Sequence, residues 1–365
     1  MLVCVAETNT KIDHGPMSNR KNHHFVPQFY FRRFSQDEKS ICVLTKATGQ
    51  LIEKASIKSQ ASRNNFYGSD ELESALGEIE GACSATLRNL VALENPTLLE
   101  GSDVSKLLLH IALQRSRTMS ARTNGQAFQD KIARLFTEMA LNLSTEIDEN
   151  TRKLLLENLE DIGAEPVQAH RIQMGVAVEA AGALEDLLPI MLVNKTNRPF
   201  VFSDAPVVFY NALYRNVRHR GVLGLSTPGL LVVFPLSSSQ CLMLVDSARY
   251  KVLKAKNNCI SIREFRDVAA INKLQLHAAS SCVYFADFQY ARYVSELWRQ
   301  EQCRFRPHTG VVVEAPGFDA GTGEPMGDIV HGFEPQLPYP FSLSFLQHPV
   351  LGDEDYQFSR RSDMY

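Results

Sequence analysis

Two adjacent histidines, His23 and His24, open the part of this sequence that is richest in residues able to do chemistry. An imidazole can act as a general acid or base, ligate a metal or contact a phosphate. Pro27 follows, and because its missing N–H would be unpaired at a first helical position, we predict a short helix over 27–34. Adjacent side chains rarely face the same way, so we take His24 as catalytic and His23 as substrate-binding. The alternative is a histidine that caps the helix and binds a backbone carbonyl.

A carboxylate and a guanidinium each interrupt the apolar face of a predicted helix. Glu80 falls inside the apolar stripe of a helix over 69–93, and Arg115 falls inside that of a helix over 102–123, with Gln114 at its edge. Such a charge needs a partner, because burying it alone costs several kcal/mol. Antiparallel packing would bring Glu80 and Arg115 together. The arginine would then present its fork to a phosphate or carboxylate, with Glu80 as orienter or base and Gln114 as a substrate contact. A buried ion pair that fixes helix register is the alternative.

Four further polar residues lie in the later, β-rich part of the chain. Asp204 ends a predicted strand, where it can be a base or metal ligand, or form an Asx-turn that ends the strand. Asn272 and Gln275 share one helix face, and their inward amides can read a base or fix a loop backbone. Arg218 belongs to a basic loop that is either solvated or in contact with a polyanion.

The order of patterns predicts an α+β protein with a mainly antiparallel sheet, because the connections between its short β-rich runs are short. The chain divides into five sections: 1–21 as a disordered segment or extension, with Met17 as an alternative start, 22–68 as the His-His helix and a β-hairpin, 69–188 as an acidic helical block, 189–314 as a sheet with covering helices, and 315–365 as a loop-rich C-terminal tail. We expect 22–314 to form one compact unit.

Charge and cysteine content exclude several classes of protein. The net charge of −3 excludes a generally basic nucleic-acid binder, although residues 1–65 carry ten Lys and Arg against five Asp and Glu. Residues 66–190 are acidic, with ten against twenty. The seven cysteines form no C-x-x-C pair, which is typical of reduced thiols and not of disulfides or structural zinc. No apolar run approaches the ~20 residues of a membrane span, and residues 1–6 do not form a signal peptide. We expect a cytoplasmic protein without a membrane partner.

Several motifs occur in an order that is typical of a known family. Residues 23–34 read His-His-Phe-Val-Pro-Gln-Phe-Tyr-Phe-Arg-Arg-Phe, and this string resembles the opening of the bacterial and fungal family known as domain of unknown function 4238. Later landmarks of that family resemble Asn65-Phe66-Tyr67, Glu80, Gln114-Arg115 with Arg117-Thr118, Phe202-Ser203-Asp204-Ala205-Pro206-Val207, Phe234-Pro235-Leu236 and Asn272-x-x-Gln275. The resemblance covers about residues 22–283. It implies an architecture and candidate positions but no activity.

The candidate residues suggest one shared cleft, with His24, Glu80, Arg115 and Asp204 as its catalytic side chains. Our first hypothesis is a hydrolase for a phosphate-containing small molecule or nucleic acid, in which His24 and Asp204 act as bases or ligands of a divalent metal. Arg115 would stabilise developing negative charge. The sequence contains no G-x-x-x-x-G-K-[ST], H-E-x-x-H or G-x-S-x-G motif, and it predicts neither a particular metal nor an oligomeric state. The alternative is a non-catalytic ligand- or protein-binding module; a toxin or phage-defence component is a third hypothesis.

Overall fold

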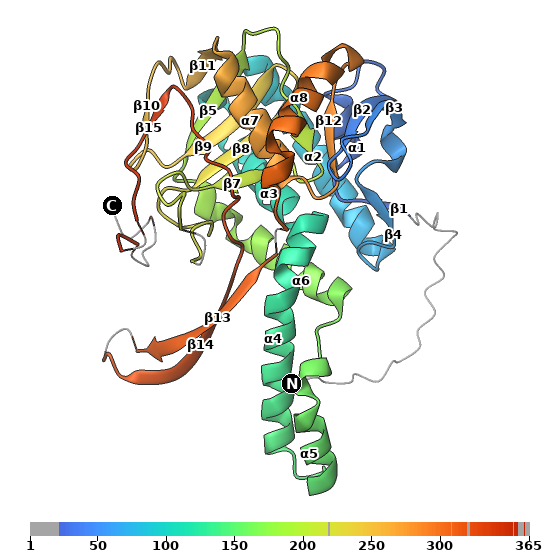
Figure 1. Ribbon diagram of the computed structural model, residues 1–365, viewed down its shortest axis with the longest axis vertical. Coiled ribbons are helices and arrows are strands. Elements are labelled where there is room, and N and C mark those ends of the chain that lie inside the picture. The colour runs from blue at the N-terminus through green and yellow to red at the C-terminus, as the bar shows by residue number, and fades with distance from the viewer. Residues whose placement is uncertain are drawn as a thin grey trace.

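The chain folds into two main β-sheets with helices packed around them, as the computed structural model in Figure 1 shows. The structure describes residues 22–217, 220–307, 309–319, 322–352, 354–356 and 361. The predicted extension over 1–21 and Arg218 lie outside the described residues. The predicted α+β class is confirmed.

The larger sheet has five strands in the order β11-β5-β9-β8-β7. Its strands are β5 (Leu188–Asn194), β7 (Val208–Tyr210), β8 (Leu231–Pro235), β9 (Gln240–Val245) and β11 (Cys259–Ile262). All neighbours pair antiparallel except β11 and β5, which are parallel. Every residue of β7, β8 and β9 is buried, so this sheet lies inside the molecule.

The second sheet has four antiparallel strands in the order β3-β2-β12-β6. Its strands are β2 (Ser40–Thr45), β3 (Leu51–Ser56), β6 (Phe202–Ser203) and β12 (Cys282–Phe285). The pair β2–β3 is the hairpin that the two apolar runs around a Gly-containing turn predict. Three two-stranded sheets complete the β-structure: β1 (Asn22–His24) with β4 (Ser62–Asn64), β10 (Lys251–Val252) with β15 (Leu346–Gln347), and β13 (Val311–Phe318) with β14 (Pro325–Phe333).

The helices supply the walls around these sheets. The α-helices are α1 (Gln28–Arg32), α2 (Asp70–Leu93), α3 (Gly101–Ser116), α4 (Met119–Leu143), α5 (Glu149–Glu157), α6 (Pro166–Glu179), α7 (Phe265–Ala278) and α8 (Ala291–Glu301). Short 3-10 helices are η1 (Ile57–Ser59), η2 (Pro96–Leu98), η3 (Leu159–Asp161), η4 (Ala180–Leu184), η5 (Phe288–Tyr290) and η6 (Gln302–Arg304).

The short helix α1 joins the two main sheets through its aromatic side chains. The Tyr30 ring stacks on Phe234 of the five-stranded sheet at 5.3 Å and meets Phe202 of the four-stranded sheet edge-on at 5.0 Å. Phe31 meets Tyr284 of the same four-stranded sheet at 4.8 Å. Because aromatic pairs of this kind stabilise beyond their buried area, α1 fixes the position of the segment just before it. That segment carries the two histidines.

The boundary between α3 and α4 differs from the predicted helix over 102–123. The α-helix α3 ends at Ser116, and Arg117 is its C-cap residue. Thr118 is then the N-cap residue of α4, with its side-chain oxygen accepting from the backbone N–H of Ala121 at 3.2 Å. A capping threonine of this kind favours a new helix start over continuation.

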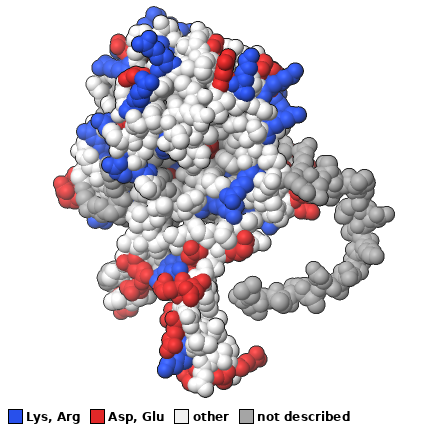
Figure 2. All heavy atoms as spheres, turned by 45° about the vertical axis from the view of Figure 1, so that its right-hand side comes forward, with Lys and Arg blue, Asp and Glu red and all other residues white. Residues whose placement is uncertain are grey.

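Two elements project from the body of the molecule in Figure 1: α4 with α5, and the hairpin β13–β14 beside it. Part of the section 315–365, predicted to be loop-rich, therefore forms regular structure, and Leu337 and Phe341 beyond the hairpin are buried in the main core. Lys131 of α4 pairs with Glu314 of the hairpin at 2.5 Å. Residues 128–165 carry nine Asp and Glu against four Lys and Arg. Acidic side chains accordingly gather on the projection in Figure 2.

None of the helices in the described part of the chain combines the length and the hydropathy that crossing a bilayer requires.

Candidate functional site

His23 is completely buried and both of its ring nitrogens have defined surroundings. In the β1–β4 pair it lies opposite Arg63, and its ring stacks on that of Tyr67 at 5.7 Å. Its Nδ1 accepts a hydrogen bond from the backbone N–H of Tyr67 at 3.1 Å. In the neutral ring the proton is therefore on Nε2, which lies 3.6 Å from Oδ1 of Asp70 and has no hydrogen-bond partner within the described chain. His23 thus directs one N–H towards a carboxylate.

His24 points to the other face of the strand, because neighbouring side chains alternate along β-structure. Its Nε2 donates to the backbone carbonyl of Lys58 at 3.1 Å. Burial lowers the pKa of His24 below its usual value, against the opposing effects of the Lys58 carbonyl and of the Glu80 carboxylate. The contact with a carbonyl is the one that the structural alternative for this histidine expects.

The predicted pairing of Glu80 with Arg115 is wrong. Oε1 of Glu80 accepts from Nη1 of Arg117 at 2.7 Å, whereas Arg115 pairs with Glu334 just beyond β14. Residues two apart on a helix point in nearly opposite directions, so only one of the two arginines can face α2. Arg117, the C-cap residue of α3, is the one that meets Glu80.

Gln114 connects this ion pair to the histidine segment. Its Oε1 accepts from Nε of Arg117 at 3.0 Å, and its Nε2 donates to the carbonyl of Phe25 at 3.0 Å. The chain from Glu80 through Arg117 and Gln114 thus ends on the backbone next to His24. These contacts fix the position of the histidine strand, and they use both ends of the Gln114 amide.

The carboxylate of Asp204 accepts hydrogen bonds from three backbone amides. Its two oxygens accept from the N–H groups of Ser280, Ser281 and Cys282 at 2.8, 2.8 and 3.2 Å. Burial raises the pKa of Asp204 above its usual value, and these three hydrogen bonds oppose that effect. Asp204 thus anchors the start of β12, a contact that neither of its predicted roles describes.

Asn272 and Gln275 also bind backbone, on either side of the short strand β6. Asn272 accepts from the N–H of Val201 at 3.0 Å and donates to the carbonyl of Pro199 at 2.8 Å. Gln275 accepts from the N–H of Ser203 at 3.0 Å and donates to the carbonyl of Pro206 at 3.0 Å. Both amides therefore fix loop backbone, which is one of the two roles that their inward position predicts.

The four predicted catalytic residues do not meet in one cleft. His24 and Glu80 belong to the same cluster at the start of the chain, close enough for the carboxylate to act on the imidazole. Arg115 lies instead over the ring of Phe209 at 5.3 Å and pairs with Glu334, and Asp204 lies in the four-stranded sheet. The shared site is thus smaller than predicted and is centred on the histidines.

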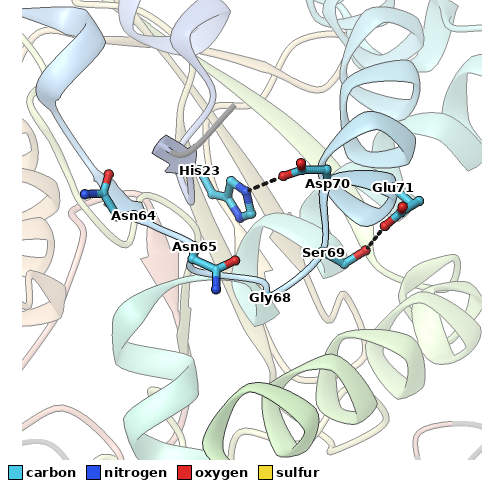
Figure 3. A pocket seen from close by; sticks show the side chains of 7 residues that line it. All are labelled: His23, Asn64, Asn65, Gly68, Ser69, Asp70 and Glu71. Atoms are coloured by element: carbon cyan, nitrogen blue, oxygen red, sulfur yellow. Dashed lines mark hydrogen bonds and ion pairs between the residues drawn. The ribbon is translucent and has the colours of Figure 1, made fainter. Parts of the chain in front are cut away.

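An open pocket of about 500 Å³ lies beside His23, between β4 and the N-terminus of α2. Figure 3 shows the residues that line this Asp70 pocket: His23, Asn64, Asn65, Gly68, Ser69, Asp70 and Glu71. The side chain of Asp70 is 37% exposed, whereas the side chain of the neighbouring His23 is only 1% exposed. Ser69 is the N-cap residue of α2, accepts from the N–H of Leu72 at 3.2 Å and donates to Glu71 at 2.7 Å.

Sequence reasoning missed Asp70, and it named Tyr67 and Arg117 only as landmarks of the family resemblance, without a role in this cluster. Asp70 follows the capping serine, and an acidic residue there is typical of the first turn of a helix. Only the distance to His23 across the fold reveals its second contact. No group of three or more His, Cys, Asp and Glu side chains within the described ranges is arranged to hold a metal ion.

The fold and the site define an α+β protein with a polar pocket between a two-stranded sheet and a helix N-terminus. The chain belongs to the family described as protein of unknown function (DUF4238), whose model matches residues 22–288. The match includes the whole Asp70 pocket, the Glu80–Arg117 pair and α7, and it ends before the projecting hairpin β13–β14. Neither a curated protein nor a solved structure matches this chain.

Proposed function

We propose that the protein is a hydrolase whose reaction takes place in the Asp70 pocket. The observation that supports this is a half-exposed carboxylate on the pocket wall with a buried imidazole N–H directed at it from 3.6 Å. In this proposal Asp70 is the catalytic residue and takes a proton from the attacking water. His23 is a positioning residue, because the hydrogen bond from Tyr67 holds its ring and directs its Nε2 proton at Asp70.

The substrate class is a phosphate-containing compound, either a nucleotide or a nucleic acid. The described walls of the pocket carry two carboxylates, from Asp70 and Glu71, and neither lysine nor arginine. The negative charge of a phosphate would be repelled by these two carboxylates unless a divalent cation entered the pocket with it. Magnesium is commonly held by one or two carboxylates together with substrate phosphates, so the substrate is proposed to bind as its magnesium complex. The amides of Asn64 and Asn65 are available to contact its other oxygens.

The second candidate is a non-catalytic ligand-binding module. It is favoured by the partners of the polar residues predicted to be catalytic or substrate-binding: Glu80, Gln114, Arg115, Asp204, Asn272 and Gln275 all bind other groups of the protein. Side chains engaged in this way organise the fold. Under this reading the Asp70 pocket holds a ligand without transforming it.

The two candidates are separated by an activity assay on the purified chain. RNA, DNA and nucleoside triphosphates are incubated with and without magnesium, and product release is measured beside an Asp70→Asn variant. We expect magnesium-dependent turnover that falls about 100-fold or more in the variant, the range typical of a lost general base. Glu78→Gln, an exposed carboxylate on the same helix, is the matched control and should retain full activity. Absence of turnover on all three substrate types would favour the binding module, and undiminished activity in Asp70→Asn would move the reaction elsewhere.

A further inference from the structure

A second pocket, of about 570 Å³, lies where four segments of the chain meet. They are the turn after β2, the first turn of α4, the end of α7 and the segment around the end of α8. The residues used in the argument are Lys46, Ser120, Thr123, Trp298, Phe305 and Arg306. We name it the Lys46 pocket. Neither its lining nor its chemistry overlaps with that of the Asp70 pocket.

The charge of the Lys46 pocket is opposite to that of the Asp70 pocket. The described residues that line it include Lys46 and Arg306 and no aspartate or glutamate. Hydroxyl groups of Ser120 and Thr123 lie on the same lining, and that of Thr123 donates to the carbonyl of Met119 at 3.0 Å. A site with two cations, the hydroxyl donor of Ser120 and no acid is suited to an anionic group.

Lys46 has donor capacity left after its contacts with the protein. Its Nζ donates to the carbonyls of His277 and Ala279 at 2.9 and 2.6 Å, at the C-terminus of α7. An ammonium group has three N–H donors, so these contacts leave one for a ligand. Burial lowers the pKa of Lys46 to about 8, against the effect of the Asp204 carboxylate. The Asp204 oxygens accept from three backbone amides, and no carboxylate of the described residues forms an ion pair with Lys46, so an anionic ligand could bind its ammonium group directly.

Aromatic rings form the other wall of the pocket. The indole of Trp298 is held in place because its Nε1 donates to the Lys46 carbonyl at 2.8 Å. Gly49 packs directly against the indole ring, where an added Cβ would come within 2.6 Å of a ring carbon. The ring of Phe305 lies with its centroid 4.8 Å from Nζ of Lys46. Flat, fixed rings next to a cation favour a ligand that has a flat ring of its own.

We propose that the Lys46 pocket binds a small molecule with one anionic group on a flat aromatic ring. The anionic group lies between Lys46 and Arg306, and the ring packs against Trp298. Arg306 is exposed and uses one nitrogen, Nη1, for the carbonyls of Cys303 and Phe305, so its other N–H groups can reach a ligand. This site does not depend on the hydrolase proposal, because it requires neither the Asp70 pocket nor a reaction.

Trp298 is the single tryptophan of the chain, so selective excitation of tryptophan reports on this pocket alone. The full-length chain is titrated with phenyl phosphate, with benzoate and with neutral benzyl alcohol. We expect a saturable fluorescence change with at least one of the anions and none with the alcohol. The anion that binds more tightly decides whether the natural ligand group is a phosphate or a carboxylate.

Variants separate binding in the pocket from unspecific quenching. Lys46→Met and Arg306→Gln should each raise the Kd of the better anion about tenfold, which corresponds to about 1.4 kcal/mol. Lys54→Met, an exposed lysine on β3, is the matched control and should leave the Kd unchanged. Lys46 also donates to the last carbonyls of α7, so the Lys46→Met variant could fail to fold. In that case the Kd of Arg306→Gln alone tests whether the anion binds in this pocket. No saturable change with either anion, an equal affinity for benzyl alcohol, or an unchanged Kd in Arg306→Gln would overturn the proposal.

Discussion

Arg117 is among the largest fully buried side chains of the described structure, and it is paired on one side only. Its Nη1 binds Glu80 and its Nε binds Gln114, whereas Nη2 is buried and has no hydrogen-bond partner within the described residues. Burial works to lower the pKa of this guanidinium, but the Glu80 carboxylate, together with Tyr67 and Glu73, outweighs burial and raises it. Glu80 is the carboxylate that binds Arg117 directly, so removing it should weaken the cluster.

Replacing Glu80 with glutamine should destabilise the protein strongly. The variant removes the carboxylate that binds the buried Arg117 directly, and loss of one partner from such a pair costs about 3–5 kcal/mol. Because Glu80 is 24% exposed, we expect the lower end, about 3 kcal/mol. Urea unfolding followed by circular dichroism measures the change, and Glu78→Gln should stay within about 0.5 kcal/mol of the wild type. The double variant Glu80→Gln/Arg117→Met should recover part of the loss; equal stability of Glu80→Gln and wild type would contradict the argument.

The sequence alone identified Glu80 as an anomaly but not its partner. A carboxylate inside an apolar stripe implies a buried contact, and the helical wheel is sufficient to show it. Its partner is Arg117 and not Arg115, and the apolar pattern, in which Arg115 falls inside the buried face, does not show this. His23 illustrates the same limit, since its neighbour Asp70 is 47 residues away along the chain and adjacent only in the fold.

At the scale of elements, the short strand β6 is held mainly by side chains. It has two residues, too few to secure itself through backbone pairing with β12 alone. Asn272 and Gln275 of α7 bind the backbone on both sides of it, and Asp204 binds the first residue of β12 and the two residues before it. The motif that contains Asp204 thus connects α7 to the four-stranded sheet through side-chain to backbone hydrogen bonds.

Asp204→Asn should lower stability although it preserves shape. An asparagine places an NH₂ group where a carboxylate oxygen now accepts from backbone N–H groups, so donors would face donors. Leaving buried amides of this kind without an acceptor costs about 2 kcal/mol. We expect a lower midpoint of urea unfolding and faster amide exchange at Ser281 and Cys282, with Asp328→Asn on the exposed strand β14 as the unaffected control. If Asp204→Asn kept its stability but lost activity, that result would instead support a catalytic role for Asp204.

Elements with a clear period were predictable, and elements stabilised by distant contacts were not. The hairpin β2–β3 and the helix α2 follow from their apolar patterns and from the Ser69 cap. The strands of β13–β14 contain glycine and proline, which weaken a strand signal. They are supported instead by contact with α4, where Phe128 packs against Gly332.

At the scale of the whole molecule, burial acts strongly on His110, His170 and His277, although His277 also contacts the Glu301 carboxylate at 3.2 Å. Burial lowers the pKa of His110 to about 3 and that of His170 and His277 to about 4. His110 lies between the rings of Phe29 and Phe234, each centroid 5.9 Å away. All three are therefore neutral in the folded chain near neutral pH. In the unfolded chain they would take up protons below about pH 6.5.

The fold should consequently lose stability as the pH falls from about 6.5 towards 4. In this window the unfolded chain binds more protons than the folded chain, so the free energy of unfolding rises with pH. The stabilisation that the three histidines contribute is fully present above about pH 6.5. Each of the three histidines contributes on the order of 2 kcal/mol of loss at pH 5, since one pKa unit corresponds to about 1.4 kcal/mol. Urea midpoints at pH 7.5 and pH 5 measure the loss.

His110→Leu isolates one histidine from the total, which matters because burial raises the pKa of Glu73 and Asp204 and these carboxyl groups oppose the trend. Leucine keeps the site between the two phenylalanine rings apolar and removes the group that titrates. Between pH 7.5 and pH 5, the free energy of unfolding of the variant should fall by about 2 kcal/mol less than that of the wild type. His331→Gln, on the exposed strand β14, should lose as much as the wild type. If His110→Leu and the wild type lose the same free energy of unfolding, His110 does not titrate below its normal range and the buried-histidine explanation fails.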